Sequence, residues 1–284
     1  QKSRYLKFEK NKLIILFKNF FIKKNFIENL KKKKIKFIAY SKENLNLENR
    51  KSVSKLKKII KPMDKIVFIS SIAPVKNVEM LSRNIEILKN VIDALKSKTF
   101  DQLIYISSDA VYKDDARIIN EFTPKTPISM HGNMHLLREN VLKDLFKEKL
   151  CILRPTLIYG ANDPHNGYGP NKFLRTIKQK KNIELFGRGE EKRDHVHIND
   201  VVNVITQCIQ KKFIGSINIA SGKVISFYDI AKACITKNRN LKIIFLPRTG
   251  PMPHNGYRRF DIRRLKSTFK IKIFTNLKNY IKNY

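Results

Sequence analysis

The chain has 284 residues, of which 42% are hydrophobic, enough to bury a core and to exclude a disordered chain. That length suits one large or two modest domains. Lysine and arginine number 59 against 24 acidic residues, and the resulting net charge of +35 would suit an anionic partner. The excess is spread along the whole chain, which favours compositional bias over binding to nucleic acid or a membrane surface.

Cysteine and glycine positions exclude several kinds of site. Cys151, Cys208 and Cys234 lie far apart without a CxxC pair, so neither a disulfide framework nor a cysteine-based zinc site is expected, and a reducing, cytoplasmic setting is predicted. No apolar run approaches the roughly 18 residues that span a bilayer. All ten glycines lie at Gly132 or later. The first 131 residues therefore contain no glycine-based phosphate loop.

Strand and helix patterns alternate through the first half of the chain. Apolar runs typical of buried parallel strands are Leu13–Phe17, Ile35–Tyr40, Lys65–Ser70, Gln102–Ser107 and Leu150–Arg154. Helical spacing is found at 19–34, with Asn19 as its cap, and at Ser52–Ile60, Val78–Leu95 and His131–Phe146. This alternation predicts an α/β fold with a doubly wound parallel sheet.

The pattern changes after Pro155. Gly160–Asn171 is rich in Gly, Pro and Asn and predicts a loop. Shorter elements follow: a helix at Phe173–Lys180, a strand at Ile183–Phe186, a helix at Asp200–Gln210 capped by Asp200, and a helix at Phe227–Ile235 with Ser226 and Asp229 as a capping pair. Because ligands of open α/β sheets bind beyond the carboxyl ends of the strands, residues after Ser107 and Arg154 are expected to face the site.

Six short segments, in order, carry a resemblance to a known family. They are YISSDAVY (Tyr105–Tyr112), LRPTLIYG (Leu153–Gly160), GPNKF (Gly169–Phe173), LFGRGEEKRDHVHINDVV (Leu185–Val202), NIASG (Asn218–Gly222) and RRFDIRRL (Arg258–Leu265). Together they resemble the extended short-chain dehydrogenase/reductases, the NAD-dependent nucleotide-sugar epimerases and dehydratases. The resemblance implies a Rossmann-like dinucleotide-binding-type domain over 1–158 and a substrate-binding lobe over 159–284, interleaved with the first domain. It further implies NAD or NADP as cofactor, a nucleotide-sugar as substrate, and a homodimer formed through the helix at His131–Phe146.

The expected cofactor turn departs from the family pattern. Its three glycine positions fall on Phe17, Phe20 and Lys23, and a phenyl ring at the second should occupy pyrophosphate space. Lysines near the helix N-terminus still favour an anion. Ser41-Lys42 stands where an NAD enzyme often carries an acidic residue, so NAD and NADP both stay open. The expected cofactor-binding residues are Phe17, Asn19, Phe20, Ser41, Lys42 and His135.

The catalytic helix departs as well, because His131 and His135 stand at the family's Tyr and Lys positions, one helical turn apart. An imidazole, with an ordinary pKa near 6.5, transfers protons at neutral pH without help from a lysine. We therefore expect His131 to be the acid/base beside Ser108, with His135 as a hydrogen-bond donor. Two alternatives stay open: packing histidines in a decayed site, and a metal pair, for which no third ligand is evident.

The remaining candidates are one carboxylate and three substrate-side residues. Asp109 is a candidate catalytic residue or a turn residue; Ala110 follows it where related dehydratases have Glu, which favours epimerisation or reduction over loss of water. Asn171, Arg193 and Arg259 match the substrate-lobe motifs, and guanidinium groups pair bidentately with a diphosphate. His165, His195 and His197 are interpreted as loop and packing residues, and Tyr168 as a ring that stacks on a base or packs. The predicted function is a nucleotide-sugar epimerase or reductase; the alternative is an inactive member that binds without redox chemistry.

Overall fold

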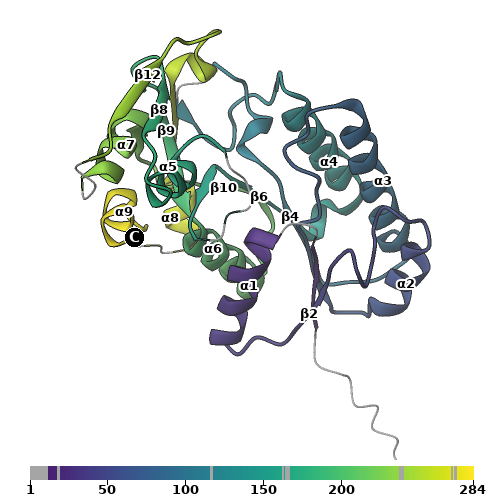
Figure 1. Ribbon diagram of the computed structural model, residues 1–284. Coiled ribbons are helices and arrows are strands. Elements are labelled where there is room, and N and C mark those ends of the chain that lie inside the picture. The colour runs from purple at the N-terminus through teal and green to yellow at the C-terminus, as the bar shows by residue number, and fades with distance from the viewer. Residues whose placement is uncertain are drawn as a thin grey trace, which may run out of the picture.

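The computed structural model describes residues 12–17, 20–115, 118–161, 163, 167–236, 240–269, 271 and 274–284. The predicted cap Asn19 and the loop residue His165 lie outside these residues. The fold is built around a parallel sheet of six strands in the order β2-β1-β3-β4-β6-β10 (Figure 1). Its strands are β1 Leu13–Leu16, β2 Phe37–Tyr40, β3 Lys65–Phe68, β4 Gln102–Ile106, β6 Leu150–Pro155 and β10 Gly215–Ile219. The predicted α/β class is confirmed.

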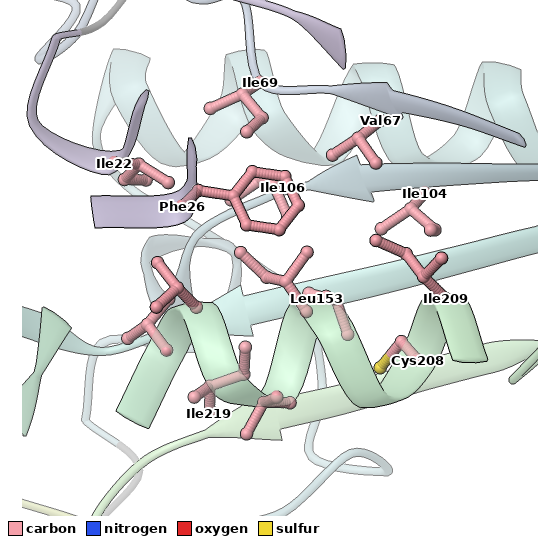
Figure 2. Close-up of a cluster of buried hydrophobic side chains, with 14 of the residues drawn as sticks. Ile22, Phe26, Val67, Ile69, Ile104, Ile106, Leu153, Cys208, Ile209 and Ile219 are labelled. Atoms are coloured by element: carbon pink, nitrogen blue, oxygen red, sulfur yellow. The ribbon is translucent and has the colours of Figure 1, made fainter. Parts of the chain in front are cut away.

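Helices cover both faces of this sheet, as the doubly wound prediction requires. Its helices are α1 Phe20–Lys32, α2 Ser52–Ile59, α3 Val78–Leu95, α4 Met130–Phe146 and α6 Ile198–Gln210. Figure 1 shows α2, α3 and α4 grouped together, with α1 and α6 side by side on the other face. Figure 2 shows the hydrophobic core on the face of the sheet covered by α1 and α6, where Phe26 of α1 and Cys208 of α6 pack onto Ile104 and Leu153 of the sheet. Each such side chain contributes roughly 1.5–3 kcal/mol when fully buried.

The second half of the chain builds a smaller lobe and then returns to the central sheet. Its elements are β5 Ile118–Ile119, β7 Leu157–Tyr159, α5 Pro170–Lys178, β8 Ile183–Phe186, β9 Lys192–His197, β11 Val224–Ser226, α7 Phe227–Ile235, β12 Ile243–Leu246, β13 Tyr257–Phe260, α8 Arg263–Phe269 and α9 Leu277–Asn283. Strands β11, β9, β13 and β5 form one sheet and β12 with β8 another. Because α6 and β10 pack on the central sheet, the two halves of the chain interleave (Figure 1).

Local sequence predicted some boundaries and missed others. Helix α3 has the predicted bounds, and Ser226 caps α7 as predicted, its Oγ accepting the Asp229 N–H at 3.0 Å. The predicted loop at Gly160–Asn171 is wrong at its end, because α5 starts at Pro170, whose fixed φ suits a first helical position. The predicted cap Asp200 is also wrong. His197 caps α6 through its Nδ1, 3.2 Å from Asn199 N, while Asp200 accepts Thr275 N–H at 2.9 Å.

No helix in the described part of the chain combines the length and the apolar character that a bilayer span requires. Sequence patterns did not predict the six-residue strand β9, because its charged and histidine residues form no apolar run. Its pairing with β7, β11 and β13 comes from tertiary contacts.

A buried ion pair joins α4 to the central sheet. Arg154 of β6 donates from Nε and Nη2 to the two carboxylate oxygens of Glu139, both at 2.7 Å, and neither side chain is exposed. Ser107 donates to Glu139 Oε1 at 2.7 Å, and Arg154 Nη1 donates to the Tyr112 hydroxyl, which donates on to Asn218 Oδ1. Burial works to raise the pKa of Glu139, but the hydrogen bonds and charge of Arg154, with the Ser107 hydroxyl and Lys143, together outweigh it and hold that pKa below its ordinary value.

Replacing Glu139 with Gln should destabilise the protein by about 3–5 kcal/mol at pH 7, because Arg154 is left as a buried charge without its partner. Urea unfolding followed by circular dichroism measures the change. The control is Glu86→Gln, in an exposed pair with Lys89, where we expect less than about 0.5 kcal/mol.

Measuring the stability difference between wild type and Glu139→Gln at several pH values checks the direction of its pH dependence. A carboxyl with a lowered folded pKa stabilises the fold above its unfolded pKa of 4.5 and loses that contribution as pH falls through the folded value. The gap between wild type and Glu139→Gln should therefore narrow below pH 4.5. Equal free energies of unfolding for wild type and Glu139→Gln at pH 7 would show that the ion pair contributes nothing to stability.

Candidate active site

A cavity of about 430 Å³ lies beyond the carboxyl ends of the central strands. Segments that follow β1, β3, β4 and β6 border it. In the strand order, β1 stands between β2 and β3, so successive strands are added on one side of β1 and then on the other; open α/β sheets bind ligands at such a switch point. Six of the predicted site residues line this single cavity: Ser108, Asp109, His131, His135, Asn171 and Arg193.

Ser108 and Asp109 follow β4 at the start of a short 3₁₀ turn. Ser108 Oγ accepts the Ala110 N–H at 3.2 Å, and its contact with the Asp109 carboxylate is long, at 3.5 Å. Asp109 is held from the other side by Arg258, whose Nε lies 3.4 Å from Oδ2 and whose Nη2 donates to the Asp109 carbonyl at 2.8 Å. The Asp109 carboxylate is therefore paired with a cation, whereas the Ser108 hydroxyl faces the cavity.

The two predicted catalytic histidines project from the start of α4. Their ring centroids are 4.7 Å apart and the rings are nearly perpendicular. His135 is buried, with Nδ1 2.6 Å from the Tyr105 hydroxyl. Burial lowers the pKa of His135 well below its ordinary value, and the neighbouring His131 and Arg138 lower it further. His135 is therefore neutral at pH 7.

Gly132 sets how closely α4 approaches the turn that carries Ser108. A Cβ at Gly132 would lie 2.2 Å from the Ala110 carbonyl oxygen and 2.6 Å from Pro127 Cβ. Since no side chain fits there, only glycine allows this contact between the helix and the 3₁₀ turn. The contact brings the histidine pair and Ser108 to one cavity.

Two of the three predicted substrate residues line the cavity and the third does not. Asn171 receives the Gly160 N–H at 3.0 Å and donates to Asp163 at 2.7 Å. Arg193 Nη1 donates to Glu191 at 3.0 Å. Arg259 is exposed on β13, where its Nε donates to the Gly222 carbonyl at 3.2 Å, away from the cavity lining.

The residue on the inner face of β13 is instead Arg258, which is buried against Asp109. A strand turns alternate side chains to opposite faces, and Phe260 of this strand is buried. The alternation of strand side chains, with Phe260 as an inward residue, is the sequence signal that could have singled out Arg258 in place of the predicted Arg259.

The residues expected to bind the cofactor lie near the ends of β1 and β2. Phe17 is only 3% exposed and packs in the core, with the Lys23 ammonium 5.8 Å from its ring centroid. The hollow beside Phe17, Lys42 and Leu45 measures only about 10 Å³, the room of about one water molecule. Ser41 hydrogen-bonds Glu43 through its hydroxyl, and Lys42 is exposed. Asn19 and the side chain of Phe20 lie outside the described residues.

The residues that are described fit one end of a nicotinamide dinucleotide better than the other. The cavity at the strand switch point has room for a ring beside Ser108 and His135. Phe17 itself packs in the core, beside a hollow of about 10 Å³. The turn expected to hold the pyrophosphate, at 18–19, lies outside the described residues, so the observed fit is to the reactive end.

Several residues around the cavity were not predicted as site residues. His195 and His197 lie on β9 rather than in loops; His195 lines the cavity, and burial lowers its pKa to about 3. His254 also lines the cavity, with Nδ1 2.7 Å from Asp114, and burial together with Arg193 lowers its pKa to about 4. Tyr168 packs against Phe227, with ring centroids 4.6 Å apart. These residues are distant in sequence, so no local spacing indicated them.

Comparison with known proteins assigns the family. The family model described as "NAD dependent epimerase/dehydratase family" matches residues 21–220. The chain belongs to this family. The YtcB protein of Bacillus subtilis, an uncharacterized UDP-glucose epimerase, is 25% identical over 71% of this chain and 65% of the relative, so the match spans just under two thirds of that relative. An ADP-L-glycero-D-manno-heptose-6-epimerase of Brachyspira hyodysenteriae is 26% identical over 72% of this chain and 68% of its own.

The solved structures agree in fold. A Thermus thermophilus UDP-glucose 4-epimerase in complex with NAD superposes with a TM-score of 0.79 at 17% identity, covering 95% of this chain and 96% of that one. The Rossmann-like α/β fold of an epimerase/dehydratase is thus shown, including the second lobe.

Replacing Gly132 with Ala should destabilise the protein by about 1–3 kcal/mol, because the added methyl group meets backbone rather than a flexible side chain. At an unconstrained position of an exposed helix the same change would stabilise by about 1 kcal/mol. The sign of the measured effect therefore decides whether the contact at Gly132 requires glycine. Thermal unfolding measures it. Gly250→Ala, where nothing lies within 4 Å of the added carbon, should leave the melting temperature nearly unchanged.

Proposed function

We propose that the chain is a nucleotide-sugar epimerase or reductase that uses NAD(P), with His131 and His135 in place of the family's Tyr and Lys. The observation that carries this proposal is the single cavity lined by Ser108, both histidines and Arg193. The relatives with epimerase names support the substrate class, a nucleoside-diphosphate-linked sugar. NAD(P), when bound, supplies the hydride acceptor and donor.

Proton transfer at the sugar hydroxyl is assigned to His131. An imidazole has its ordinary pKa near 6.5, so it accepts and returns a proton at neutral pH without a cation to adjust it. Ser108 hydrogen-bonds the same sugar oxygen: its Oγ accepts the Ala110 N–H, and its hydrogen makes only a long 3.5 Å contact with Asp109, which a ligand oxygen in the cavity can replace. His135, neutral and buried, acts as a hydrogen-bond donor beside them.

The polar groups of the second lobe orient the substrate. Arg193 pairs with a diphosphate, a role for which the planar guanidinium is well suited. Asn171, fixed between Gly160 and Asp163, presents its amide at the cavity rim. Asp109, paired with Arg258 and followed by Ala110, does not offer the free base that removal of water requires, which favours epimerisation or reduction over dehydration.

The family resemblance also gives a homodimer through α4. Leu137 and Leu145 of α4 are exposed by 42% and 45%, and Ile85 of the neighbouring α3 by 41%. This apolar surface supports the dimer proposal.

Replacing His131 with Ala should lower kcat by about 10²–10⁴-fold, the contribution of one positioned acid/base group. The measurement is conversion of UDP- and ADP-linked sugars, followed by chromatography of the products. Asn140→Ala, at an exposed position of the same helix, is the matched control and should keep wild-type activity. Full activity in a folded His131→Ala protein would refute the assignment.

A second candidate function is binding of a nucleotide-sugar without redox chemistry. The observation that favours it is the filled space at Phe17, where the hollow measures about 10 Å³. In this alternative the cavity and Arg193 keep their ligand, and the dinucleotide does not bind.

Titration calorimetry with NAD, NADP and a nucleotide-sugar separates the two candidates. The enzyme proposal expects binding of a nucleotide-sugar and of one dinucleotide. Arg193→Gln should weaken the nucleotide-sugar by about tenfold or more while leaving the dinucleotide unaffected, because a charge-assisted hydrogen bond contributes about 1.5–3 kcal/mol. Binding of the nucleotide-sugar alone would favour the second candidate.

A further inference from the structure

Behind the histidine pair lies a buried tyrosine that the proposed chemistry does not use. Tyr105 is the fourth residue of β4, and its side chain is 1% exposed. Its hydroxyl oxygen lies 2.6 Å from His135 Nδ1, a short contact between two buried groups. Burial raises the pKa of Tyr105 well above its ordinary value, so the hydroxyl keeps its hydrogen.

Arg138 lies one helical turn beyond His135, and the charge of its guanidinium works to lower the pKa of the Tyr105 hydroxyl, against the larger effect of burial. Arg138 is 1% exposed, and the next residue, Glu139, is paired with Arg154. Its own hydrogen bonds run to the Ser70 carbonyl at 2.8 Å and to the Asn84 carbonyl and side-chain oxygens at 2.6 and 3.0 Å.

Arg138 is thus a buried cation whose hydrogen bonds within the described ranges go to neutral groups. Buried charges are usually paired with an opposite charge, because an unpaired one is costly. A cation kept here without an ion pair directs a positive field at the Tyr105 hydroxyl. Such an arrangement costs stability, and a role at the adjoining cavity explains why it is tolerated.

The direction of the hydrogen bond follows from the chemistry of the two groups. Among the described residues, the Tyr105 hydroxyl has His135 Nδ1 as its hydrogen-bond partner. A buried hydroxyl that keeps its hydrogen and has no other acceptor beside it directs that hydrogen at Nδ1, which therefore accepts it. A neutral imidazole with an acceptor at Nδ1 carries its hydrogen on Nε2, on the side of the ring away from Tyr105.

The geometry points to Tyr105 as a positioning residue: the hydrogen bond from its hydroxyl fixes the tautomer of His135 so that an Nε2–H donor faces the cavity. This inference rests on the proposed function for its ligand, an oxygen of the sugar substrate or of the cofactor ribose. Donation from Tyr105 polarises the imidazole, and the positive charge of the nearby Arg138 acts in the same direction, so the Nε2–H is a better donor without His135 becoming charged. The cavity then holds a neutral donor where the family pattern has a lysine.

The groups that face His135 leave this arrangement intact near neutral pH. They are His131 and Arg138 on α4 and Tyr105 on β4. Arg138 opposes a second proton on His135, and burial opposes it further. The donor therefore stays neutral while His131, nearer the helix start, exchanges protons with the substrate.

The test measures which ring nitrogen of His135 carries the hydrogen. Full-length protein labelled with ¹⁵N-histidine is studied by two-bond ¹H–¹⁵N correlation spectra, which report the chemical shifts of both ring nitrogens. We expect wild-type His135 to show hydrogen on Nε2 and a hydrogen-bonded acceptor at Nδ1. In Tyr105→Phe, which keeps the ring, the Nδ1 resonance should move to the position of an acceptor without a hydrogen bond. Tyr159→Phe removes another buried hydroxyl, bonded to the Thr275 carbonyl at 3.0 Å, and should leave the His135 resonances unchanged.

Turnover supplies the second readout. Tyr105→Phe should lower kcat about tenfold, the worth of one buried hydrogen bond, while KM for the nucleotide-sugar changes less than about twofold. Hydrogen on Nδ1 in the wild type, or an unchanged Nδ1 resonance in folded Tyr105→Phe, would overturn the inference. The spectra need no substrate, so this result stands apart from the His131→Ala test. If the spectra show the expected hydrogen bond from Tyr105 to His135 but the protein has no turnover, the proposed function is refuted and the inference about Tyr105 stands.

Discussion

The bidentate ion pair between Arg154 and Glu139 is the contact on which the candidate site depends. It joins β6 to α4 in a place from which water is excluded, and Ser107, Tyr112 and Asn218 satisfy the remaining donors and acceptors. Breaking such a network strands a charge, so its members hold one geometry. Because α4 carries both Glu139 and the two histidines, fixing the helix against the sheet also fixes the histidines over the cavity.

Helix α4 serves two purposes at once. Its buried side supplies two charged residues, Arg138 and Glu139, whose partners differ in kind. Glu139 forms an ion pair with Arg154, whereas Arg138 has only neutral hydrogen-bond partners within the described residues. Its first two turns supply the histidines, and Gly132 between them lets the helix lie against the turn that carries Ser108. Stability and the candidate chemistry therefore share one element, and substitutions in it will affect both.

How far the sequence could be interpreted depended on whether the signal was local. Buried parallel strands gave continuous apolar runs, and α3 had both its period and its cap, Asn77, within one segment. Ser108, Asn171 and Arg193, which come from three of the motif segments, line one cavity together with His131 and His135, which come from the helix that departs from the family pattern. Asp200 and Arg259 were misjudged because a capping signal and an arginine pair are each ambiguous without the packing around them: His197 caps α6, and Arg258 faces inward.

By itself the sequence determined the α/β class, the strand–helix order and the candidate chemistry, since periodicity and residue type are properties of short segments. Tertiary structure alone decided the partners of the charged groups. Arg154 meets Glu139 and Tyr112, Tyr105 meets His135, and Phe17 fills the space at the end of β1. The physical reason is that the protonation state and orientation of a buried polar group are set by the groups beside it. Those groups come from elements far apart in the chain.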